Sequence, residues 1–509
     1  MKDIKSSDIA SEILDESFDM KPEEIRKLGY HTVDLIVDYF KNINKTQLTP
    51  SLTLEQMIKL LDEPLPYDEQ NPQSVLNECE EKIIPNAIRI GNPRLLGWIL
   101  ASGTVIGSFA DGLASAINQN VTVSGSGVAT AVELLVINWI KEILGYDSNA
   151  AGILVSGGSI ANLTGLAVGR NVKANFDVLK EGMQQNKNMV FYASEETHIS
   201  VSKAAGILGI GRDNIRLIKV DENFCLDVKD LNDKITQDQK LGKHPFAVVA
   251  TAGTVNTGAI DPLDPIADIC QKYNLWFHVD AAYGGFAALS PDLKPLLRGI
   301  SRADSIAINP HKWLFIPYEA GCVLVKNPKH LKDTFTVNAD YVHLDDNKKS
   351  SNYDIDFSDY GLQLSRDFRA LKIWMSLKQY GVKKYSKIIN QNVNCAKLLA
   401  ALVEESSSFI LANSVNLSIV CFQYTPEDLK QRYPKEKTES YLNQLNQEII
   451  KSMRADARIL LSSTIIKNKF VLRACIVNYR TTKQDIKTIL KIIKELGVAA
   501  DKKLQNTKF

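Results

Sequence analysis

The chain has 509 residues, 45% of them hydrophobic, and a formal net charge of +1 at pH 7. This length and composition suit a globular protein with roughly two or three core-bearing units, and they exclude a disordered, collagen-like or fibrous chain. The dispersed basic residues give no electrostatic patch for nucleic acid or for an anionic membrane, and the seven cysteines, which lack paired spacing, favour reduced thiols in the cytoplasm over a disulfide framework.

Residues 21–43 are predicted to form an amphipathic helix. Pro22 suits the first helical turn, and Ile25, Val33 and Phe40 share one apolar face that has to pack against another surface. The residues before this helix lack the apolar run of a secretory signal, so we expect no export.

Residues 151–163 have the pattern of a buried strand, a glycine pair and the start of a helix. Gly157 and Gly158 let the backbone approach an anion closely, and Ser159 adds a hydroxyl at the positive end of the helix. This pattern predicts a phosphate cradle, although the same residue types at a strand-to-helix turn also serve for capping alone.

Residues 189–194 are predicted to form a second buried strand. A polar turn follows, with His198 just before a helical stretch at 201–208. A histidine at this place can stack on a bound ring, or it can simply be satisfied at the start of the helix, so both interpretations stay open.

A further strand, expected at 275–280, ends in the carboxylate of Asp280. The small residues at 281–285, among them Ala282, leave room for a flat ring to lie against the backbone. His278 and Asp280 could instead belong to a metal site. We expect no metal, because no second cluster of histidines or carboxylates follows at ligand spacing.

The strand expected at 305–308 is followed by a turn that carries Lys312. Pro310 cannot extend the strand ladder, so the Lys312 amine lies at the carboxyl edge of the sheet, where open α/β sheets bind ligands. A partly desolvated lysine near other cations has a lowered pKa and can form a Schiff base with an aldehyde. Pyridoxal 5′-phosphate (PLP) is such an aldehyde, and Asp280 supplies the anion that its ring nitrogen needs. The alternative is an ordinary surface lysine just past a strand.

Apolar runs alternate with helical patterns through the middle of the chain, which predicts an α/β fold with a mostly parallel, seven-stranded sheet and helices on both faces. The runs lie at residues 152, 189, 215, 246, 275, 305 and 320. Residues 334–361 are polar and lack periodicity, which predicts a long exposed loop that serves as a lid. From residue 386 the pattern changes to a smaller α+β domain, whose last helix is capped by Thr482 and Asp485.

The segments around Lys312, Asp280, His198 and the glycine pair, in this order and spacing, resemble the PLP-dependent group II amino acid decarboxylases, the family of aromatic-L-amino-acid, glutamate and histidine decarboxylases. The resemblance runs from about residue 21 to residue 380 and returns at 470–473. It implies PLP as the cofactor, the fold type I of PLP-dependent transferases, and a homodimer with active sites at the subunit interface. It also implies three parts, which are an N-terminal helical dimerisation segment (1–100), a large PLP-binding domain (101–385) and a small C-terminal α+β domain (386–509).

The resemblance also implies which residues bind the cofactor. They are the covalent lysine Lys312, the ring-nitrogen partner Asp280, the ring-face residues His198 and Ala282, the phosphate-loop residues Gly158 and Ser159, and Asn309 and His311, which match positions at the phosphate and at the lysine junction. His198, Asp280 and Lys312 would take part in catalysis as well.

Four further positions concern the substrate and the proton. By resemblance, Arg366 lies near the substrate carboxylate, and Tyr341 in the lid donates a proton to the α-carbon after carbon dioxide leaves. Related aldehyde-forming enzymes carry phenylalanine where this chain has Tyr341, so the tyrosine favours plain decarboxylation. Trp98 and Ile99 match the wall of the substrate pocket. This apolar wall favours an aromatic amino acid over glutamate, whose second carboxylate would need a cation.

Other interpretations remain. A decarboxylase of a non-aromatic amino acid such as glutamate, a PLP-dependent aldehyde synthase, an aminotransferase or a lyase would share Lys312 and Asp280. A metal-dependent hydrolase could use His278, Asp280 and His311. A non-catalytic binding module would not require an amine, an anion and a phosphate cradle to converge.

Overall fold

The computed structural model describes residues 18–122, 127–184, 188–337 and 355–506. The chain divides into two compact units, Met1–Arg89 and Ile90–Phe509. In the described part of the chain, no helix is both long enough and apolar enough to cross a bilayer.

The first unit is helical. Its helices are α2 (Pro22–Asn42), α3 (Leu54–Leu61) and α4 (Pro72–Glu78), followed by a π-helical turn at Cys79–Ile83. The predicted N-terminal helix is therefore confirmed, with Pro22 in its first turn. Helix α2 buries none of its residues, and Ile25 and Val33 on its apolar face stay 56% and 40% exposed.

The second unit contains a seven-stranded sheet in the order β1-β7-β6-β5-β4-β2-β3. Its strands are β1 (Ala151–Val155), β2 (Met189–Ser194), β3 (Ile215–Ile218), β4 (His244–Thr251), β5 (Trp276–Asp280), β6 (Ser305–Ile308) and β7 (Gly321–Val325). Strand β7 is antiparallel to both of its neighbours, and the other pairs are parallel. The mostly parallel sheet and all seven predicted strands are confirmed.

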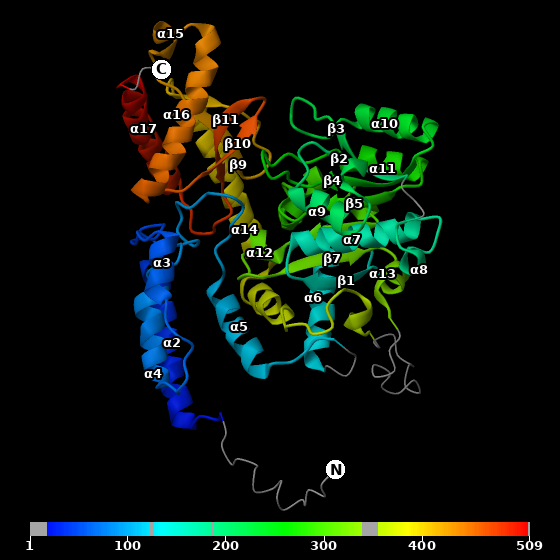
Figure 1. The fold of residues 1–509 in the computed structure, drawn as a ribbon, viewed down its shortest axis with the longest axis horizontal. Helices are drawn as coiled ribbons and strands as arrows, with labels where there is room; N and C mark the ends of the chain where they lie inside the picture. Colours follow the sequence, from blue (N-terminus) through cyan, green and yellow to red (C-terminus); the bar gives the residue numbers. More distant parts are fainter. Residues whose placement is uncertain (1–17, 123–126, 185–187, 338–354, 507–509) are drawn as a thin grey trace, which may run out of the picture. The chain divides into compact units, whose positions relative to one another are not determined.

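Helices cover both faces of this sheet. As a result, strands β2, β5, β6 and β7 are buried at every position. The helices are α5 (Val105–Ile117), α6 (Val128–Leu144), α7 (Gly158–Lys173), α8 (Val178–Glu181), α9 (Ile199–Ile207), α10 (Val228–Lys240), α11 (Leu263–Lys272), α12 (Pro310–Trp313) and α13 (Pro328–Phe335). Short 3-10 turns lie at Arg212–Asn214, Gly284–Leu289, Lys294–Leu297, Ile300–Arg302 and Phe357–Asp359. Helix α7 packs with α9 and α13, and α10 packs with α11 (Figure 1).

Helix α7 lies very close to strand β5. A Cβ atom added to Gly165 would come within 2.7 Å of the His278 ring, and one added to Gly169 would come within 2.6 Å of the Trp276 ring. These two glycines therefore allow the helix to approach the strand, and this approach places the start of α7 beside the strand ends.

The C-terminal part begins with α14 (Ala370–Glu404), which is interrupted at Gly381 with φ 64° and ψ 160°. It continues with the antiparallel sheet β10-β11-β9-β8 and three more helices (Figure 1). These elements are β8 (Phe409–Leu411), β9 (Ile419–Tyr424), α15 (Leu429–Arg432), α16 (Lys435–Asp456), β10 (Ser462–Ile466), β11 (Lys469–Cys475) and α17 (Lys483–Asn506). The predicted α+β character is confirmed.

The predicted cap of the last helix is confirmed as well. The backbone N–H of Thr482 donates to Asp485 Oδ2 at 3.0 Å, and that of Asp485 donates to Thr482 Oγ1 at 3.3 Å. Behind this cap, Ile486, Ile489 and Ile493 are fully buried in a second hydrophobic core formed by the C-terminal elements.

Candidate active site

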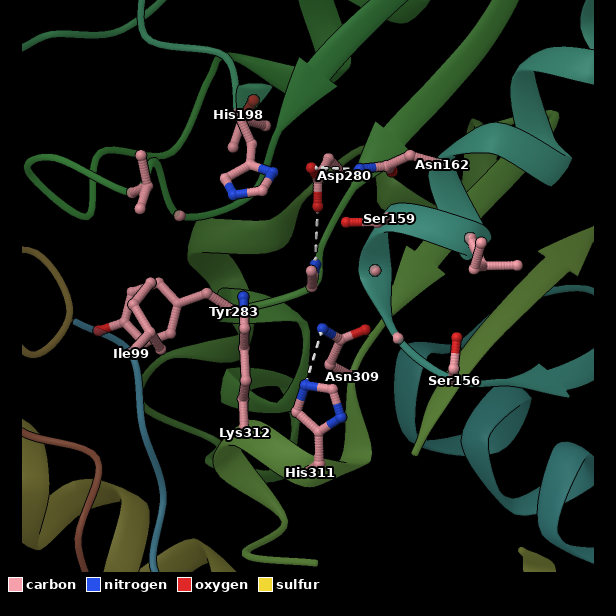
Figure 2. Close-up of a pocket in the computed structure, with 17 residues that line it drawn as sticks. Ile99, Ser156, Ser159, Asn162, His198, Asp280, Tyr283, Asn309, His311 and Lys312 are labelled. Atoms are coloured by element: carbon pink, nitrogen blue, oxygen red, sulfur yellow. Dashed lines mark hydrogen bonds between the residues drawn. The ribbon is translucent and has the colours of Figure 1, made fainter. Parts of the chain in front are cut away.

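A cavity of about 350 Å³ lies where five strands of the large sheet end (Figure 2). Strands β1, β2, β4, β5 and β6 all run in one direction, so their carboxyl ends meet at one edge of the sheet. The cavity is lined by Ile99, Ser156, Gly157, Gly158, Ser159, Ile160, Asn162, His198, Thr251, Gly253, Val255, Asp280, Ala282, Tyr283, Asn309, His311 and Lys312. All eight residues expected to bind the cofactor are thus brought together.

Lys312 lies in the short helix α12, which starts at Pro310 directly after strand β6. Burial lowers the pKa of its amine, the charge of Asp280 opposes this effect, and the charge of Arg473 adds to it. A lowered pKa leaves more of the amine unprotonated near neutral pH, which is the form that attacks an aldehyde.

Asp280 ends strand β5, and its side chain is held from two sides. Oδ2 accepts a hydrogen bond from Asn162 Nδ2 at 2.8 Å, and Oδ1 accepts one from the backbone N–H of Ala282 at 3.1 Å (Figure 2). Because both oxygens are engaged, the carboxylate has one fixed orientation in the cavity.

His198 caps the start of helix α9. Its Nδ1 lies 2.7 Å from Ser200 Oγ and accepts a hydrogen bond from the Ser200 backbone N–H at 3.2 Å. Burial lowers the pKa of His198, Asp280 opposes this shift and Lys312 adds to it. The imidazole is therefore neutral near pH 7.

The start of helix α7 forms the anion cradle. The first amides of a helix have no intrahelical acceptor, so those near Gly158 and Ser159 can donate to a phosphate. A Cβ atom added to Gly158 would lie 3.1 Å from both Ala282 and Asn309. This is a tight contact, so glycine lets the backbone at this position lie close to both residues.

Asn309 and His311 form the opposite wall of this cradle. The Ala320 N–H donates to Nδ1 of His311 at 3.1 Å, and burial lowers the pKa of this histidine to about 3. The single proton of the neutral ring therefore lies on Nε2, which faces the Asn309 amide at 3.2 Å. The structure places Asn309 Nδ2 at this position and leaves Oδ1 without a partner, and since two N–H groups cannot bond to each other, exchanging the amide oxygen and nitrogen would let Oδ1 accept the His311 proton.

The residues present fit PLP. The cradle supplies donors for a phosphate, Asp280 supplies an anion, Lys312 supplies an amine, and Thr251 adds a buried hydroxyl without a partner among the described residues. A buried polar group left without a protein partner is expected to bond to a ligand.

The structure does not bring every predicted site residue to the cavity. The Arg366 guanidinium pairs with Glu133 and donates to the carbonyls of Val121 and Leu154 at 2.9 Å and 2.8 Å, and it does not line the cavity. It therefore has a structural place here rather than the expected one beside a substrate carboxylate. Tyr341 lies outside the described residues.

The predicted substrate wall is only partly present. Ile99 lines the cavity and is 8% exposed. The Trp98 side chain is 48% exposed and does not line the cavity, while its carbonyl accepts a hydrogen bond from Arg473 at 3.0 Å.

Arg473, to which sequence reasoning gave no role, does not line the cavity, but its charge helps to lower the pKa of the Lys312 amine. It is buried, no carboxylate forms an ion pair with it in the described part of the chain, and its Nη2 has no hydrogen-bond partner there. Val471 and Cys475 on the same face of β11 belong to the core of the large sheet, so Arg473 faces that core too. A charged residue inside an apolar strand was the signal that could have identified it.

His278 does not serve a metal site in this structure. Its ring is fully buried between Ser305 and Asn162, at 2.7 Å and 2.9 Å, and it does not line the cavity. Among the residues that the structure describes, no cluster of histidine, cysteine and carboxylate side chains is arranged to hold a metal ion.

Comparison with known proteins agrees with this geometry. Residues 55–425 match the sequence model of the pyridoxal-dependent decarboxylase conserved domain. An aromatic-L-amino-acid decarboxylase of Bacillus atrophaeus is 35% identical over 486 residues, 95% of this chain and 98% of the relative. A phenylacetaldehyde synthase of a Rosa hybrid cultivar is 29% identical, and the match covers 92% of both chains.

A solved structure shares the fold. The crystal structure of Catharanthus roseus tryptophan decarboxylase in complex with L-tryptophan has a TM-score of 0.84 and 27% identity, and the match covers 94% of this chain and 99% of that chain. The fold, the convergence of Lys312, Asp280 and the anion cradle, and these matches lead to one conclusion. The chain belongs to the family of pyridoxal-dependent decarboxylases.

Proposed function

We propose that the protein decarboxylates an aromatic L-amino acid, such as tyrosine, tryptophan, phenylalanine or a hydroxylated relative, to the primary amine and carbon dioxide. The observation that carries this proposal is the position of Lys312, Asp280 and the anion cradle in one cavity, whose lining also includes the apolar side chains of Ile99 and Val255. The names of the aromatic decarboxylases among the relatives support the substrate class.

PLP, when bound, supplies an electron-withdrawing ring that stabilises negative charge on the substrate α-carbon. Lys312 would hold it covalently, and Asp280 would pair with the ring nitrogen. His198 and Ala282 would pack against its two faces. Its phosphate would be held by the α7 amides, by Ser159 and by the side chains of Asn309 and His311.

The chain's own side chains orient the substrate. The positive charge of Arg473 lies close enough to act on the Lys312 amine and has no carboxylate partner among the described residues, so we assign it to the α-carboxylate of the substrate. The carboxylate must be free to leave, so Arg473 serves to place it rather than to bind it tightly.

The substrate class follows from the cavity wall. Ile99, Val255 and Tyr283 contribute apolar and aromatic surface. Among the described lining residues, Lys312 is the one ammonium or guanidinium group, and it is required for the cofactor. The second carboxylate of glutamate would therefore be buried without a cation, which disfavours glutamate as substrate.

Tyr341 is proposed to return a proton to the α-carbon, and this role rests on the resemblance to the family alone. An aldehyde synthase is the second candidate function, favoured by the similarity to the Rosa phenylacetaldehyde synthase. The variant Tyr341→Phe separates the two. We expect it to lose amine formation and instead to consume dioxygen and water and release carbon dioxide, aldehyde, hydrogen peroxide and ammonia, whereas unchanged amine turnover would contradict the role of Tyr341.

We also propose a cytoplasmic homodimer with residues 1–100 as the dimerisation segment, 101–385 as the PLP-binding domain and 386–509 as the small domain. The exposed apolar side chains of Ile25 and Val33 on helix α2 support a partner surface, and the free thiols of all seven cysteines support a reducing compartment. Sedimentation that shows an active monomer would contradict the dimer.

The decisive experiment for the function uses the purified, PLP-loaded enzyme with aromatic amino acids and glutamate, scored for carbon dioxide and amine. We expect both products from at least one aromatic substrate. Carbon dioxide from glutamate alone would overturn the substrate class.

A further inference from the structure

We propose that Asn162 is a positioning residue of the active site, and that its side-chain amide both holds the carboxylate of Asp280 and fixes which nitrogen of His198 carries the proton. The proposal rests on the cofactor and the reaction of the family but not on the identity of the substrate.

The position of Asn162 on helix α7 is unusual. It is 1% exposed and lies between Gly158, Gly165 and Gly169 on the helix face that packs against β5. Because the glycines bring the helix so close, the one long side chain in this row reaches strand β5 directly. A polar side chain in such a place is stable only when its hydrogen bonds are satisfied.

The hydrogen bonds around Asn162 have a fixed direction. Trp276 Nε1 can only donate, and it donates to Ser305 Oγ at 2.8 Å. Ser305 Oγ also lies 2.7 Å from His278 Nδ1, and His278 Nε2 lies 2.9 Å from Asn162 Oδ1. Burial lowers the pKa of His278 to about 4, so this ring is neutral and carries a single proton.

The other end of the network fixes where that proton lies. The Asn162 NH₂ group donates to Asp280 Oδ2 at 2.8 Å and to Ser200 Oγ at 3.0 Å. Asn162 Oδ1 is therefore an acceptor, which places the His278 proton on Nε2 and makes Nδ1 the acceptor of the Ser305 hydroxyl. Every donor in this chain of side chains then meets one acceptor.

The branch through Ser200 sets the state of His198. Since Ser200 Oγ accepts from Asn162, its own proton is free to be donated to His198 Nδ1 at 2.7 Å. The Ser200 backbone N–H points to the same nitrogen at 3.2 Å. With two donors at Nδ1, the proton of the neutral His198 ring lies on Nε2.

The consequence is a cavity with two preset groups. His198 presents an N–H donor at Nε2, which has no hydrogen-bond partner among the described residues. Asp280 presents a carboxylate whose orientation depends on the Asn162 amide (Figure 2). One buried amide thus couples Asp280, which would pair with the cofactor ring nitrogen, to His198, which would pack against the cofactor ring.

The test uses the PLP-loaded enzyme and two variants. Asn162→Leu keeps the branching and the number of side-chain heavy atoms and removes both branches of the network. Ser200→Ala removes the Oγ link to His198 and leaves the Asp280 contact in place. Thr164→Val is the matched control, because Thr164 is buried on the same helix and takes no part in the network. Circular dichroism checks the fold of each variant.

Two readouts separate the branches. Nitrogen NMR of isotopically labelled histidine reports the His198 tautomer, and the variant His198→Gln serves only to assign its signals. Equilibrium dialysis reports the affinity for PLP. We expect Asn162→Leu to weaken PLP binding at least tenfold and to mix the His198 tautomers. We expect Ser200→Ala to change the His198 signals while PLP affinity stays within threefold, and the double variant to match Asn162→Leu alone in the His198 signals.

The proposal is overturned if Asn162→Leu leaves both readouts as in the wild type, or if Thr164→Val reproduces its effects. It is also overturned if Ser200→Ala weakens PLP binding as much as Asn162→Leu, because the two branches would then not be separate. If Asn162→Leu does not fold, Ser200→Ala alone decides the His198 branch. Neither readout needs a substrate, so failure here is distinct from failure of the proposed aromatic specificity.

Discussion

Two buried arginines, Arg366 and Arg473, illustrate two different uses of the same side chain. The terminal nitrogens of Arg366 donate to a carboxylate, Glu133, and to two backbone carbonyls, and its side chain is 1% exposed. Arg473 donates to the carbonyls of Asn256 and Trp98 and to the Ser462 hydroxyl, and no carboxylate pairs with it in the described chain.

The difference lies in what neutralises the charge. Arg366 has its counter-ion inside the protein, so it holds helix α6, strand β1 and the segment before α14 together. Arg473 faces the large sheet, where its charge acts on the Lys312 amine. A buried guanidinium that lacks a protein counter-ion is available to the carboxylate of a ligand, so the comparison separates groups that hold the fold from groups that hold a ligand.

Lys312 belongs to the ligand-holding group, and its loss should have the largest effect. Lys312→Ala should release no carbon dioxide, should bind PLP weakly and should lack the visible absorbance band of the lysine–PLP Schiff base, because the amine that forms this bond is gone. The free energy of unfolding without cofactor should change by less than about 1 kcal/mol. Turnover assays, absorbance spectra and denaturant titrations measure these quantities, and retained turnover would contradict the assignment.

Breaking the Arg366 pair should chiefly affect the fold. Arg366→Met leaves the Glu133 carboxylate buried and unpaired, so the free energy of unfolding should fall by about 3–5 kcal/mol. Urea unfolding followed by circular dichroism measures this loss. The double variant Arg366→Met/Glu133→Leu is the control and should recover a large part of it, whereas an unchanged midpoint in the single variant would remove the fold-holding role.

Arg473→Met should have the opposite signature. Losing a hydrogen bond to a charged group costs about 1.5–3 kcal/mol, which corresponds to a fall in kcat/KM of roughly 10- to 100-fold. Its unfolding free energy should fall less than that of Arg366→Met, because no carboxylate is left unpaired. Arg473→Lys keeps the charge and should recover part of the rate. Equal losses of stability in the two methionine variants would break the comparison.

Thr251→Val tests the same distinction with a smaller expected effect. The Thr251 hydroxyl is buried and has no partner in the described part of the chain. Removing it should not lower the stability of the cofactor-free protein, but it should weaken PLP binding by about 0.5–1.5 kcal/mol, or roughly two- to tenfold. A titration of the cofactor-free variant with PLP measures this change, and unaltered affinity would show that the hydroxyl does not bond to the cofactor.

Much of the fold could be predicted from the sequence. Central strands that are buried on both faces, such as β2, β5 and β6, give unbroken apolar runs, and Asp280 and Lys312 could be placed because they follow such runs. The edge strand β3 is only partly buried, but its short apolar pattern was recognised as well. Strand β8 has only three residues and was missed, since so short a segment carries little periodicity.

Sequence reasoning located the site residues that lie at the end of a strand, such as Asp280. It did not find the contacts that a residue makes with a partner far away in the sequence. Nothing local to Arg366 shows that Glu133, far along the chain, neutralises it. Asn162 stood inside the predicted phosphate loop, but its contacts with His278 and Asp280 exist only because helix α7 lies so close to β5. Such pairings are set by tertiary packing.

Helix α14, after its break at Gly381, connects the core of the large sheet to the core of the small one. Helix α14 contributes Ile389 and Val393 to the core of the large sheet and Leu399 and Val403 to the core of the small one. No atom lies within 4 Å of a Cβ built on Gly381, and its φ of 64° favours glycine. The course of the helix at this point is thus set by a backbone torsion rather than by steric contact. Ile389, Val393, Leu399 and Val403 all follow this break, so one uninterrupted stretch of helix α14 packs into both cores and ties the small sheet that carries Arg473 to the large sheet that carries Lys312.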